Sequence, residues 1–463
     1  MTIVTAPECN TPARDAALAV IAHLRAQGHE AYLAGGCVRD ELLGLTPGDY
    51  DVATDATPQR LASLFHHARL VGAKFGVVQV RREGIWTEVA TFRSDGDYSD
   101  RRRPDAVTFS DPQSDAERRD FTINALFLDP LATPSEWTTH SNGRARGRVI
   151  DLVSGLADLE SGIIRAVGDP ERRLAEDHLR ALRAVRFAAR LGFEIEPQTA
   201  HAIAAHSGHL EGISRERIGG ELRRMLVHAS RARAASLLES LGLDAPVFEE
   251  RPVGAGLAHP RLSNLPQEHG VAPALAAWML DRGHGFELAG VKPMASRLRQ
   301  ALCLSNDEHT LLVQVLQCRH AILDGFLETA KAAQKRQAAS PGFESALRIL
   351  FGEAPDLAIR VSQRVVELQA EPGGLAPARW VTGYDLIAQG LKPGPQFVRI
   401  LEGLYDLQLD GTAQDRATLL EQLAILCVQE GKQAHSLGTD HSKDRTGHPA
   451  GDKDHEPGTP GSY

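Results

Sequence analysis

The sequence GGCVRDELLGLTPGDYD, residues 35–51, indicates most about the fold and the chemistry of this chain. Gly35 and Gly36 lack a Cβ, so the backbone there can turn sharply and approach a phosphate closely. In an extended strand successive side chains alternate between faces, so Asp49 and Asp51 would project from one side. Magnesium is usually bound by one or two carboxylates together with substrate phosphates. Each element alone is more often a turn or a solvated cap, but their order and closeness indicate phosphoryl or nucleotidyl transfer.

Length, composition and charge bound the class of protein. The chain has 463 residues, which suggests about three domains. It contains no run of eighteen or more apolar residues, and its N-terminus lacks the basic and apolar regions of a signal peptide, so we expect a soluble, cytoplasmic protein without membrane association. The five cysteines have no paired spacing and predict neither a zinc site nor disulfides. Because the formal net charge is −9, RNA binding would need a local basic patch.

The N-terminal part is predicted to mix strands and helices. An amphipathic helix over Ala13–Gln27 is followed by strand and helix patterns that suggest a small mixed α/β domain. We expect strands at Ala31–Ala34, Asp49–Ala53, Phe75–Arg81 and Ile85–Phe92, and a short helix at Pro58–Phe65. The polar stretch Arg93–Glu117 is predicted to be a long loop without regular structure.

From Ala157 onward the chain is predicted to be almost continuous helix with polar breaks, and the remainder, to about Glu430, has no convincing strand. The expected helices include Arg172–Leu191, Pro197–Ala205 and Ser214–His228. Proline, glycine and histidine are frequent over Glu249–Gly290, which predicts a loop-rich joint. The final segment, residues 431–463, is poor in apolar residues and is expected to be disordered.

A second informative string is RRDFTINAL, residues 118–126. Its double arginine could pair with a triphosphate, and Asp120 could orient either arginine. The alternative is the charged, capped start of a helix. The string alone leaves both interpretations open.

A third string is EDHLRALRAVRF, residues 176–187. On one continuous helix Asp177, Arg180, Arg183 and Arg186 would form a single stripe. Like charges at this spacing repel by roughly a few tenths of a kcal/mol per pair, and an anionic ligand would relieve that repulsion. A solvated surface is the usual explanation of a charged stripe, but the apolar residues between and after these arginines predict that the helix is packed.

Together the three strings resemble the class II tRNA nucleotidyltransferases, the CCA-adding enzymes, and their relatives the bacterial poly(A) polymerases. The resemblance covers residues 31–226, with a further match over 382–411 that begins TGYDLIAQGLKPGP. It implies an α+β fold, in which a nucleotidyltransferase-type head with a mixed sheet is followed by an all-helical neck, body and tail. The implied divisions are a catalytic head over 1–150, a neck with a nucleotide-selecting template over 151–230, an RNA-binding body and tail over 231–430, and a disordered tail over 431–463.

The resemblance also implies roles for individual residues. Asp49 and Asp51 would hold Mg²⁺ and carry the catalysis, with two metal ions activating the RNA 3′-hydroxyl and stabilising the leaving pyrophosphate. Glu88, in a predicted strand, is the candidate third carboxylate, although an exposed strand glutamate is nearly as good an interpretation. The nucleotide-binding residues would be Gly35, Gly36, Arg39, Arg119, Asp120, Asn124, Asp177, Arg180, Arg183 and Arg186.

Asp177 and Arg180 would form the protein template that reads the base. A carboxylate accepts from the exocyclic amine of cytosine or adenine, and a guanidinium donates to the neighbouring ring acceptors. Uracil and guanine present the reversed pattern and would leave buried polar groups unpaired. Glu221, farther along, could brace the arginine stripe.

The implied activity is the addition of CMP and AMP, from CTP and ATP, to the 3′ end of tRNA or another RNA. The stretch VGAKFGVV, residues 71–78, is more similar to the tRNA enzymes than to the poly(A) polymerases. The loop over 94–117, with Arg101, Arg102 and Arg103, suits a full CCA-adding or an A-adding enzyme. An A-adding enzyme, a poly(A) polymerase and a non-catalytic RNA-binding protein of the same fold remain the alternatives, and no protein partner is indicated.

Overall fold

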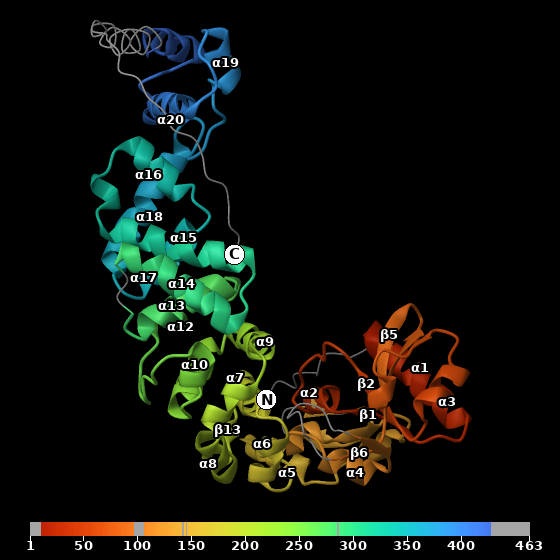
Figure 1. Ribbon diagram of the computed structural model, residues 1–463. Coiled ribbons are helices and arrows are strands. Elements are labelled where there is room, and N and C mark those ends of the chain that lie inside the picture. Colours follow the sequence, from red (N-terminus) through yellow and green to blue (C-terminus); the bar gives the residue numbers. More distant parts are fainter. Residues whose placement is uncertain (1–10, 97–105, 141–142, 145, 285–286, 427–463) are drawn as a thin grey trace, which may run out of the picture. The chain divides into compact units, whose positions relative to one another are not determined.

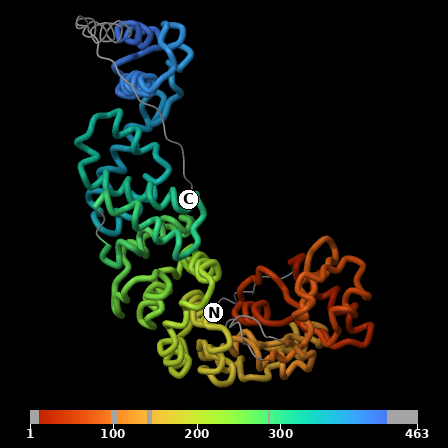
Figure 2. The backbone as a smooth tube through the Cα atoms, viewed as in Figure 1, coloured from red at the N-terminus to blue at the C-terminus, as the bar shows by residue number. Residues whose placement is uncertain are grey.

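The computed structural model describes residues 11–96, 106–140, 143–144, 146–284 and 287–426 (Figure 1). The chain separates into two compact units, of which the first comprises Met1–Asp324 and Ser340–Ser362, and the second comprises Gly325–Ala339 and Gln363–Tyr463. Figure 2 traces the backbone through both units. In the first unit, residues 11–150 are called the head and residues 151–230 the neck.

The head is built on a seven-stranded sheet with the order β11-β8-β1-β2-β5-β4-β3. Its strands are β1 (Ala31–Ala34), β2 (Asp51–Thr54), β3 (Ala68–Arg69), β4 (Val77–Arg82), β5 (Ile85–Thr91), β8 (Phe127–Asp129) and β11 (Arg148–Ile150). The pair β2 and β5 is parallel and the other neighbours are antiparallel. This mixed sheet, with the largely helical remainder, confirms the predicted α+β fold class.

Helices cover the sheet of the head. They are α1 (Pro12–Ala26), α2 (Gly36–Leu42), α3 (Pro58–Leu64) and α4 (Pro112–Glu117). Helix α1 begins where the Thr11 side chain accepts a hydrogen bond from the backbone N–H of Arg14, with Pro12 in the first turn, where its missing N–H costs nothing. Its apolar residues, among them Val20 and Leu24, are fully buried, and the helix packs against β4 and β5.

Two strand boundaries in the head differ from those predicted. The second strand begins at Asp51 and not at Asp49, because Asp51 already pairs with Ala34, the last residue of β1. Asp49 therefore has no partner strand beside it. The strand predicted to begin at Phe75 begins at Val77, after a 3-10 turn that ends at Phe75.

The prediction of an unstructured loop over Arg93–Glu117 is also wrong. Strand β6 (Arg93–Asp95) pairs with β7 (Val107–Phe109), and α4 follows directly. The Asp111 side chain caps α4 by accepting from the backbone N–H of Ser114 at 2.8 Å. Polar composition concealed this structure because hairpin pairing uses backbone groups, which the side-chain pattern does not report. Residues 97–105, which include the three arginines noted above, lie outside the described residues.

The neck is mainly helical. It contains α5 (Gly155–Ser161), α6 (Pro170–Glu176), α7 (Leu179–Leu191), α8 (Pro197–Ala205) and α9 (Arg215–Leu226). The helix predicted over Arg172–Leu191 is interrupted at Asp177, whose φ of −154° and ψ of 101° are those of extended backbone. The neck is also not all-helical as expected, since β12 (Ile163–Ile164) and β13 (Glu194–Ile195) form a short parallel pair.

The rest of the first unit continues as packed helices. They are α10 (Arg231–Ser240), α11 (Asp244–Phe248), α12 (Pro260–Asn264), α13 (Val271–Asp281), α14 (Leu288–Leu302), α15 (Asn306–Leu323) and α17 (Phe343–Phe351). The loop-rich joint expected over Glu249–Gly290 therefore contains α12 and α13. Ala272 to Asp281 are all buried in α13, and Trp278 is among the largest fully buried side chains. The alanine, leucine and methionine residues of α13 favour helix, and its one proline, Pro273, lies in the first turn, where it is tolerated.

The second unit is helical in its described residues. Its elements are α16 (Lys331–Ala338), the C-terminal half of α18 (Pro355–Ala370), α19 (Gly383–Ala388) and α20 (Pro395–Asp410). A cluster that includes Leu386, Ile400 and Leu404 forms its core. The segment 431–463, expected to be disordered, lies outside the described residues. No helix within the described part of the chain is long and apolar enough to cross a membrane.

Candidate nucleotide-transfer site

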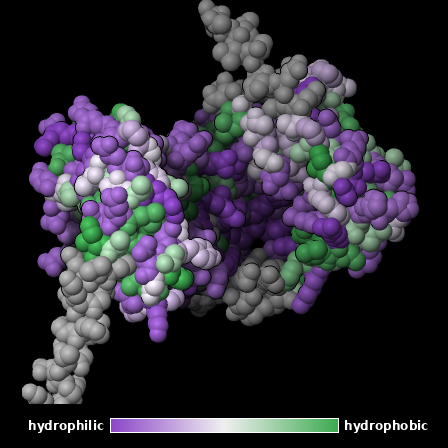
Figure 3. Space-filling model, turned by 90° about the horizontal axis from the view of Figure 1, so that it is seen from above, coloured by the Kyte–Doolittle hydropathy of each residue, from purple (hydrophilic) through white to green (hydrophobic). Residues whose placement is uncertain are grey.

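A cavity of about 810 Å³ lies in the first unit, lined by the sheet of the head and by the neck. Every residue that the sequence singled out for catalysis or nucleotide binding lines this cavity, namely Gly35, Gly36, Arg39, Asp49, Asp51, Glu88, Arg119, Asp120, Asn124, Asp177, Arg180, Arg183 and Arg186. Segments more than a hundred residues apart in sequence therefore meet at one site. Hydrophilic side chains are also frequent on the face of the molecule seen in Figure 3.

The glycine turn connects β1 to α2 at one wall of the cavity. Gly35 has a φ of 77°, in the region that L-residues with a Cβ rarely adopt. A Cβ at Gly35 would lie 2.9 Å from Nη1 of Arg119. The same Nη1 donates to the backbone oxygen of Asn124 at 3.1 Å. Glycine is therefore required here both for the backbone turn and for the close approach of an arginine.

Three acidic side chains converge at the end of the central strands. Asp51 is the first residue of β2, and the parallel register that pairs Val52 with Val89 sets Glu88 beside it on β5. Asp49 precedes the strand and lines the same cavity. The strand alternation used to predict convergence was thus wrong in detail, but the convergence of Asp49 and Asp51 was right.

The proximity of these carboxylates changes their proton affinities. Burial raises the pKa of Asp51 to about 7, and the charges of Glu88 and Asp49 add to the rise while Arg119 opposes it. Burial and Asp49 also raise the pKa of Glu88. Both residues line the cavity, so protein surrounds part of each carboxylate while the rest remains accessible to solvent. A bound cation would reduce the repulsion among these carboxylates.

The donor set fits magnesium. Carboxylate oxygens are the ligands that Mg²⁺ prefers, and its shell is usually completed by substrate phosphates and water. Among the described residues, no three histidine, cysteine, aspartate or glutamate side chains already form a complete metal-binding group. Asp49 and Asp51 are two carboxylates of the kind that Mg²⁺ shares with substrate phosphates.

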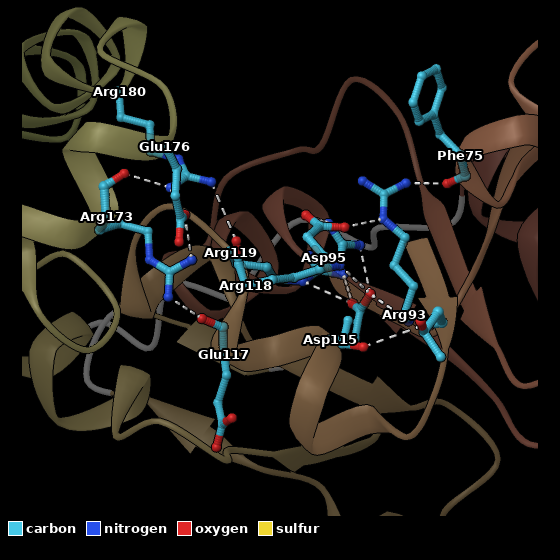
Figure 4. Close-up of polar contacts among 12 residues, drawn as sticks. Phe75, Arg93, Asp95, Asp115, Glu117, Arg118, Arg119, Arg173, Glu176 and Arg180 are labelled. Carbon is cyan, nitrogen blue, oxygen red and sulfur yellow. Dashed lines mark hydrogen bonds and ion pairs between the residues drawn. The ribbon is translucent and has the colours of Figure 1, made fainter. Parts of the chain in front are cut away.

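The double arginine is held by a residue that the sequence analysis did not identify. Asp115 pairs with Arg118 at 2.5 Å and with Arg119 at 3.0 Å, as Figure 4 shows. Burial alone would raise the pKa of Asp115, but the two guanidiniums outweigh burial and lower it. The expectation that Asp120 orients Arg118 or Arg119 is therefore wrong. The nearby Arg93 is similarly paired, with Asp95 at 2.8 Å.

Arg39 is tied into the wall of the cavity. Its side chain is only 4% exposed. It donates to Asp40 at 2.6 Å and to the Asn124 side chain, and its guanidinium lies 5.0 Å from the ring centre of Phe187 on α7. These contacts join the glycine turn to the neck. A phosphate contact by Arg39 stays a prediction.

Asp177 lies in the break between α6 and α7 and not on a continuous helix. Its Oδ2 accepts from Arg217 of α9 at 2.6 Å, and its Oδ1 accepts from the backbone N–H of Leu179 at 3.1 Å. The break displaces Asp177 from the stripe that was predicted, yet it and Arg180 both line the cavity. Arg217 is a lining residue that the sequence analysis missed, because only tertiary packing brings α9 to this point.

The protein itself neutralises the arginine stripe of α7. Arg180 pairs with Glu176 at 2.5 Å (Figure 4), Arg183 pairs with Asp120 at 2.6 Å, and Arg186 pairs with Glu221 at 2.7 Å. The expectation that an anionic ligand relieves the repulsion is therefore wrong for these three arginines. The expectation that Glu221 braces the stripe is confirmed.

Comparisons with known proteins identify the family of this chain. Residues 31–165 match the family model described as the poly A polymerase head domain, and residues 192–252 match a probable RNA and SrmB-binding site of polymerase A. The CCA-adding enzyme of Limosilactobacillus fermentum is 34% identical over 435 residues, which cover 91% of this chain and 98% of that protein. The enzyme of Levilactobacillus brevis is 34% identical over 393 residues, covering 83% and 91% of the two chains.

Solved structures give the same result. The Bacillus stearothermophilus CCA-adding enzyme in complex with CTP has a TM-score of 0.68 and 27% identity, covering 92% of this chain and all of that one. The Thermotoga maritima CCA-adding enzyme complexed with tRNA shares the fold, with a TM-score of 0.60, 20% identity, and coverage of 88% and 93%. The chain therefore belongs to the family of CCA-adding enzymes, which are nucleotidyltransferases.

Proposed function

We propose that this chain adds CMP and AMP, from CTP and ATP, to the 3′ end of tRNA. The observation that carries the proposal is one cavity lined both by Asp49 and Asp51 and by Asp177 and Arg180. A nucleotide bound there is within reach of the carboxylates suited to transfer and of the polar pair suited to base choice. The activity named for the relatives supports the choice of reaction and substrate.

In this proposal the RNA 3′-oxygen forms a bond to the α-phosphorus of the nucleotide, and pyrophosphate leaves. Asp49 and Asp51 would hold magnesium, with Glu88 as a third carboxylate beside them. Magnesium bound there supplies Lewis-acid stabilisation of the attacking and leaving oxygens. Arg119, at the glycine turn, would bind the triphosphate, and its pairing with Asp115 fixes its direction before the substrate arrives.

Asp177 and Arg180 would select the base without a nucleic-acid template. Arg217 and the start of α7 hold the Asp177 carboxylate, and Glu176 holds Arg180, so both groups are fixed in direction. A fixed acceptor and a fixed donor penalise uracil and guanine, because a mismatched base leaves one of them unpaired. Because both groups are already fixed, little further conformational entropy is lost when the nucleotide binds.

The proposal includes the division of the chain stated from the sequence. The head over 1–150 would carry catalysis, the neck over 151–230 the template, and the remainder to residue 430 the RNA contacts. Cytoplasmic location also stays a prediction. Addition of AMP alone, or of longer poly(A), is the second candidate, because the residues that line the cavity suit adenine as well as cytosine.

The deciding experiment supplies purified protein with tRNA that ends before, within or after CCA, and with CTP, ATP or both. Full CCA addition predicts that CTP alone extends the first end by two nucleotides and that both nucleotides together extend it by three. If CTP is never used, and ATP alone extends the ends that lack only the final A, the protein is an A-adding enzyme. Long ATP-dependent products would indicate a poly(A) polymerase, and no incorporation on any end would contradict the proposal.

A further inference from the structure

A second cavity, of about 200 Å³, adjoins the nucleotide cavity along α7. Its wall comes from α7, from α9 and from the connection to α10, and it includes Arg224, His228 and Ser230. Arg186 and Arg190 line both cavities. The two spaces therefore share a cationic wall, and a strand that leaves the larger cavity along α7 would pass the smaller one.

The charges around the second cavity are not balanced. Arg186 and Arg224 both pair with the single carboxylate of Glu221, at 2.7 Å and 2.6 Å. Arg190 is exposed and forms no ion pair with any carboxylate of the described residues. Three guanidiniums thus share one negative charge, which leaves an excess positive charge accessible to solvent.

Arg190 differs from the other arginines of the nucleotide cavity in having no carboxylate partner among the described residues. Within the described part of the chain, each of the others is paired with a protein carboxylate, namely Arg39, Arg93, Arg118, Arg119, Arg180, Arg183, Arg186 and Arg217. Their pairing fixes them in place for a substrate already inside the cavity. Arg190 retains its full charge for a partner that arrives from outside.

The position of Arg190 separates it from the triphosphate of the incoming nucleotide. It follows Arg180 by ten residues of α7, which corresponds to about 15 Å along the helix axis. The triphosphate, by contrast, would lie on the head, at Gly35 and Arg119. A stacked strand advances about 3.4 Å per nucleotide, so the separation from Arg180 corresponds to roughly four nucleotides.

We propose that Arg190, assisted by Arg224, binds a backbone phosphate of the RNA strand within roughly four nucleotides of its 3′ end. The proposal rests on the proposed function, since it assumes that an RNA 3′ end enters the nucleotide cavity. Arg190 is then an RNA-binding residue that holds the strand while the end is extended. Its contact is to phosphate and carries no information about sequence.

The first test measures RNA binding and steady-state kinetics of Arg190→Ala, Arg190→Lys and Arg224→Ala. Loss of one charge-assisted phosphate contact should raise the KM for tRNA about tenfold in Arg190→Ala, with the KM for CTP unchanged. The slope of log affinity against log salt should become shallower by about 1. Arg190→Lys should retain the slope. Arg172→Ala, which removes an arginine 83% exposed on α6, is the matched control and should change neither quantity.

The second test uses RNA in which single linkages near the 3′ end are replaced by uncharged methylphosphonate. One linkage among the last four should weaken binding to the wild type, and the same substitution should have no further effect in Arg190→Ala. If Arg190→Ala raises the KM for CTP and not the KM for tRNA, Arg190 serves the nucleotide. If Arg190→Ala leaves the salt slope unchanged, Arg190 has only a structural role. Either result overturns the proposal. A wild-type protein that binds tRNA but adds nothing would overturn the proposed function, while the binding comparison would still decide the role of Arg190.

Discussion

The guanidinium of Arg183 lies 2.6 Å from Oδ2 of Asp120, and this ion pair joins helix α7 of the neck to the Arg-Arg-Asp segment of the head. Asp120 also accepts a hydrogen bond from the side chain of Asn124 at 3.1 Å. Burial by itself raises the pKa of Asp120, but Arg183 and these hydrogen bonds outweigh burial and lower the pKa to about 2. The carboxylate therefore stabilises the wall of the cavity in its ionised form.

Replacement of Asp120 by asparagine should destabilise the protein in a pH-dependent way. The pKa of an unfolded aspartate is about 3.9, above the value of about 2 in the folded protein, so the ionised group stabilises the fold above about pH 4. That contribution, on the order of 2 kcal/mol, is lost as the pH falls from about 4 through about 2. Urea unfolding at several pH values should show a difference from wild type that is constant between pH 7 and 5 and shrinks below pH 4. Asp324→Asn, at an exposed position, is the matched control, and a difference for Asp120→Asn that persists to pH 2 would contradict the assignment.

Replacement of either central carboxylate should stop nucleotide transfer while RNA remains bound. Asp49→Asn and Asp51→Asn each keep the size of the side chain but remove a charge that magnesium requires. We expect incorporation of CMP to fall below detection, and tRNA affinity measured by filter binding to stay within about twofold, because neither carboxylate supplies a positive charge to the RNA phosphates.

Glu88→Gln should lower transfer by about 10- to 100-fold, the range typical of residues that support a metal site. Glu344→Gln, whose parent side chain is 83% exposed on α17, is the control and should retain full activity. Undiminished incorporation by both aspartate variants would remove these residues from catalysis, and full activity of Glu88→Gln would assign Glu88 to the exposed surface.

An alanine at Gly35 should weaken nucleotide binding, whereas an alanine at Gly28 should not. Both glycines have positive φ, 77° and 83°, which a residue with a Cβ adopts only with strain. The ψ of −127° at Gly35 lies outside the left-handed helical region, so alanine there should cost more than the roughly 1–2 kcal/mol typical of that region. Only at Gly35 would the new Cβ meet another group, Nη1 of Arg119 at 2.9 Å, while nothing lies within 4 Å at Gly28. We expect a raised KM for CTP in Gly35→Ala alone, together with a lower melting temperature than that of Gly28→Ala. Equal KM values would show that Arg119 does not depend on the turn.

Removal of Arg217 should impair base selection although Arg217 lies on a different helix from the template. Arg217 donates to Oδ2 of Asp177 at 2.6 Å, and a hydrogen bond to a charged group contributes about 1.5–3 kcal/mol. In Arg217→Ala the carboxylate is free to rotate, so the ratio of kcat/KM for CTP to that for UTP should fall by about tenfold or more. Arg233→Ala, which breaks an exposed pair with Glu194, should leave the ratio unchanged. A changed rate with an unchanged ratio would indicate a general structural role for Arg217.

Local signals predicted most elements of the head but not their pairings. The strand at Ala31–Ala34 was predicted at its observed boundaries, because a short apolar run between a helix end and a glycine turn is distinctive. The hairpin of β6 and β7 was missed, since its stability comes from backbone hydrogen bonds between residues such as Ser94 and Thr108 that are distant in sequence. Helix α13 was missed for a different reason. Proline, glycine and histidine are frequent across residues 249–290, and they obscured a short run of alanine, leucine and methionine that favours helix.

The sequence by itself determined which side chains are available to the site and the order in which they occur. Glycines, carboxylates and arginines have intrinsic chemistry, so the first string indicated nucleotidyl transfer, and the family resemblance carried by all three strings implied one nucleotide-binding site. Only the tertiary structure decided which carboxylate pairs with which arginine. Asp115 holds Arg119, Asp120 holds Arg183, and Arg190 has no carboxylate partner among the described residues. Electrostatic interactions depend on distance through space, and the packing of α7 and α9 against the head sets those distances without leaving a signal in any one segment.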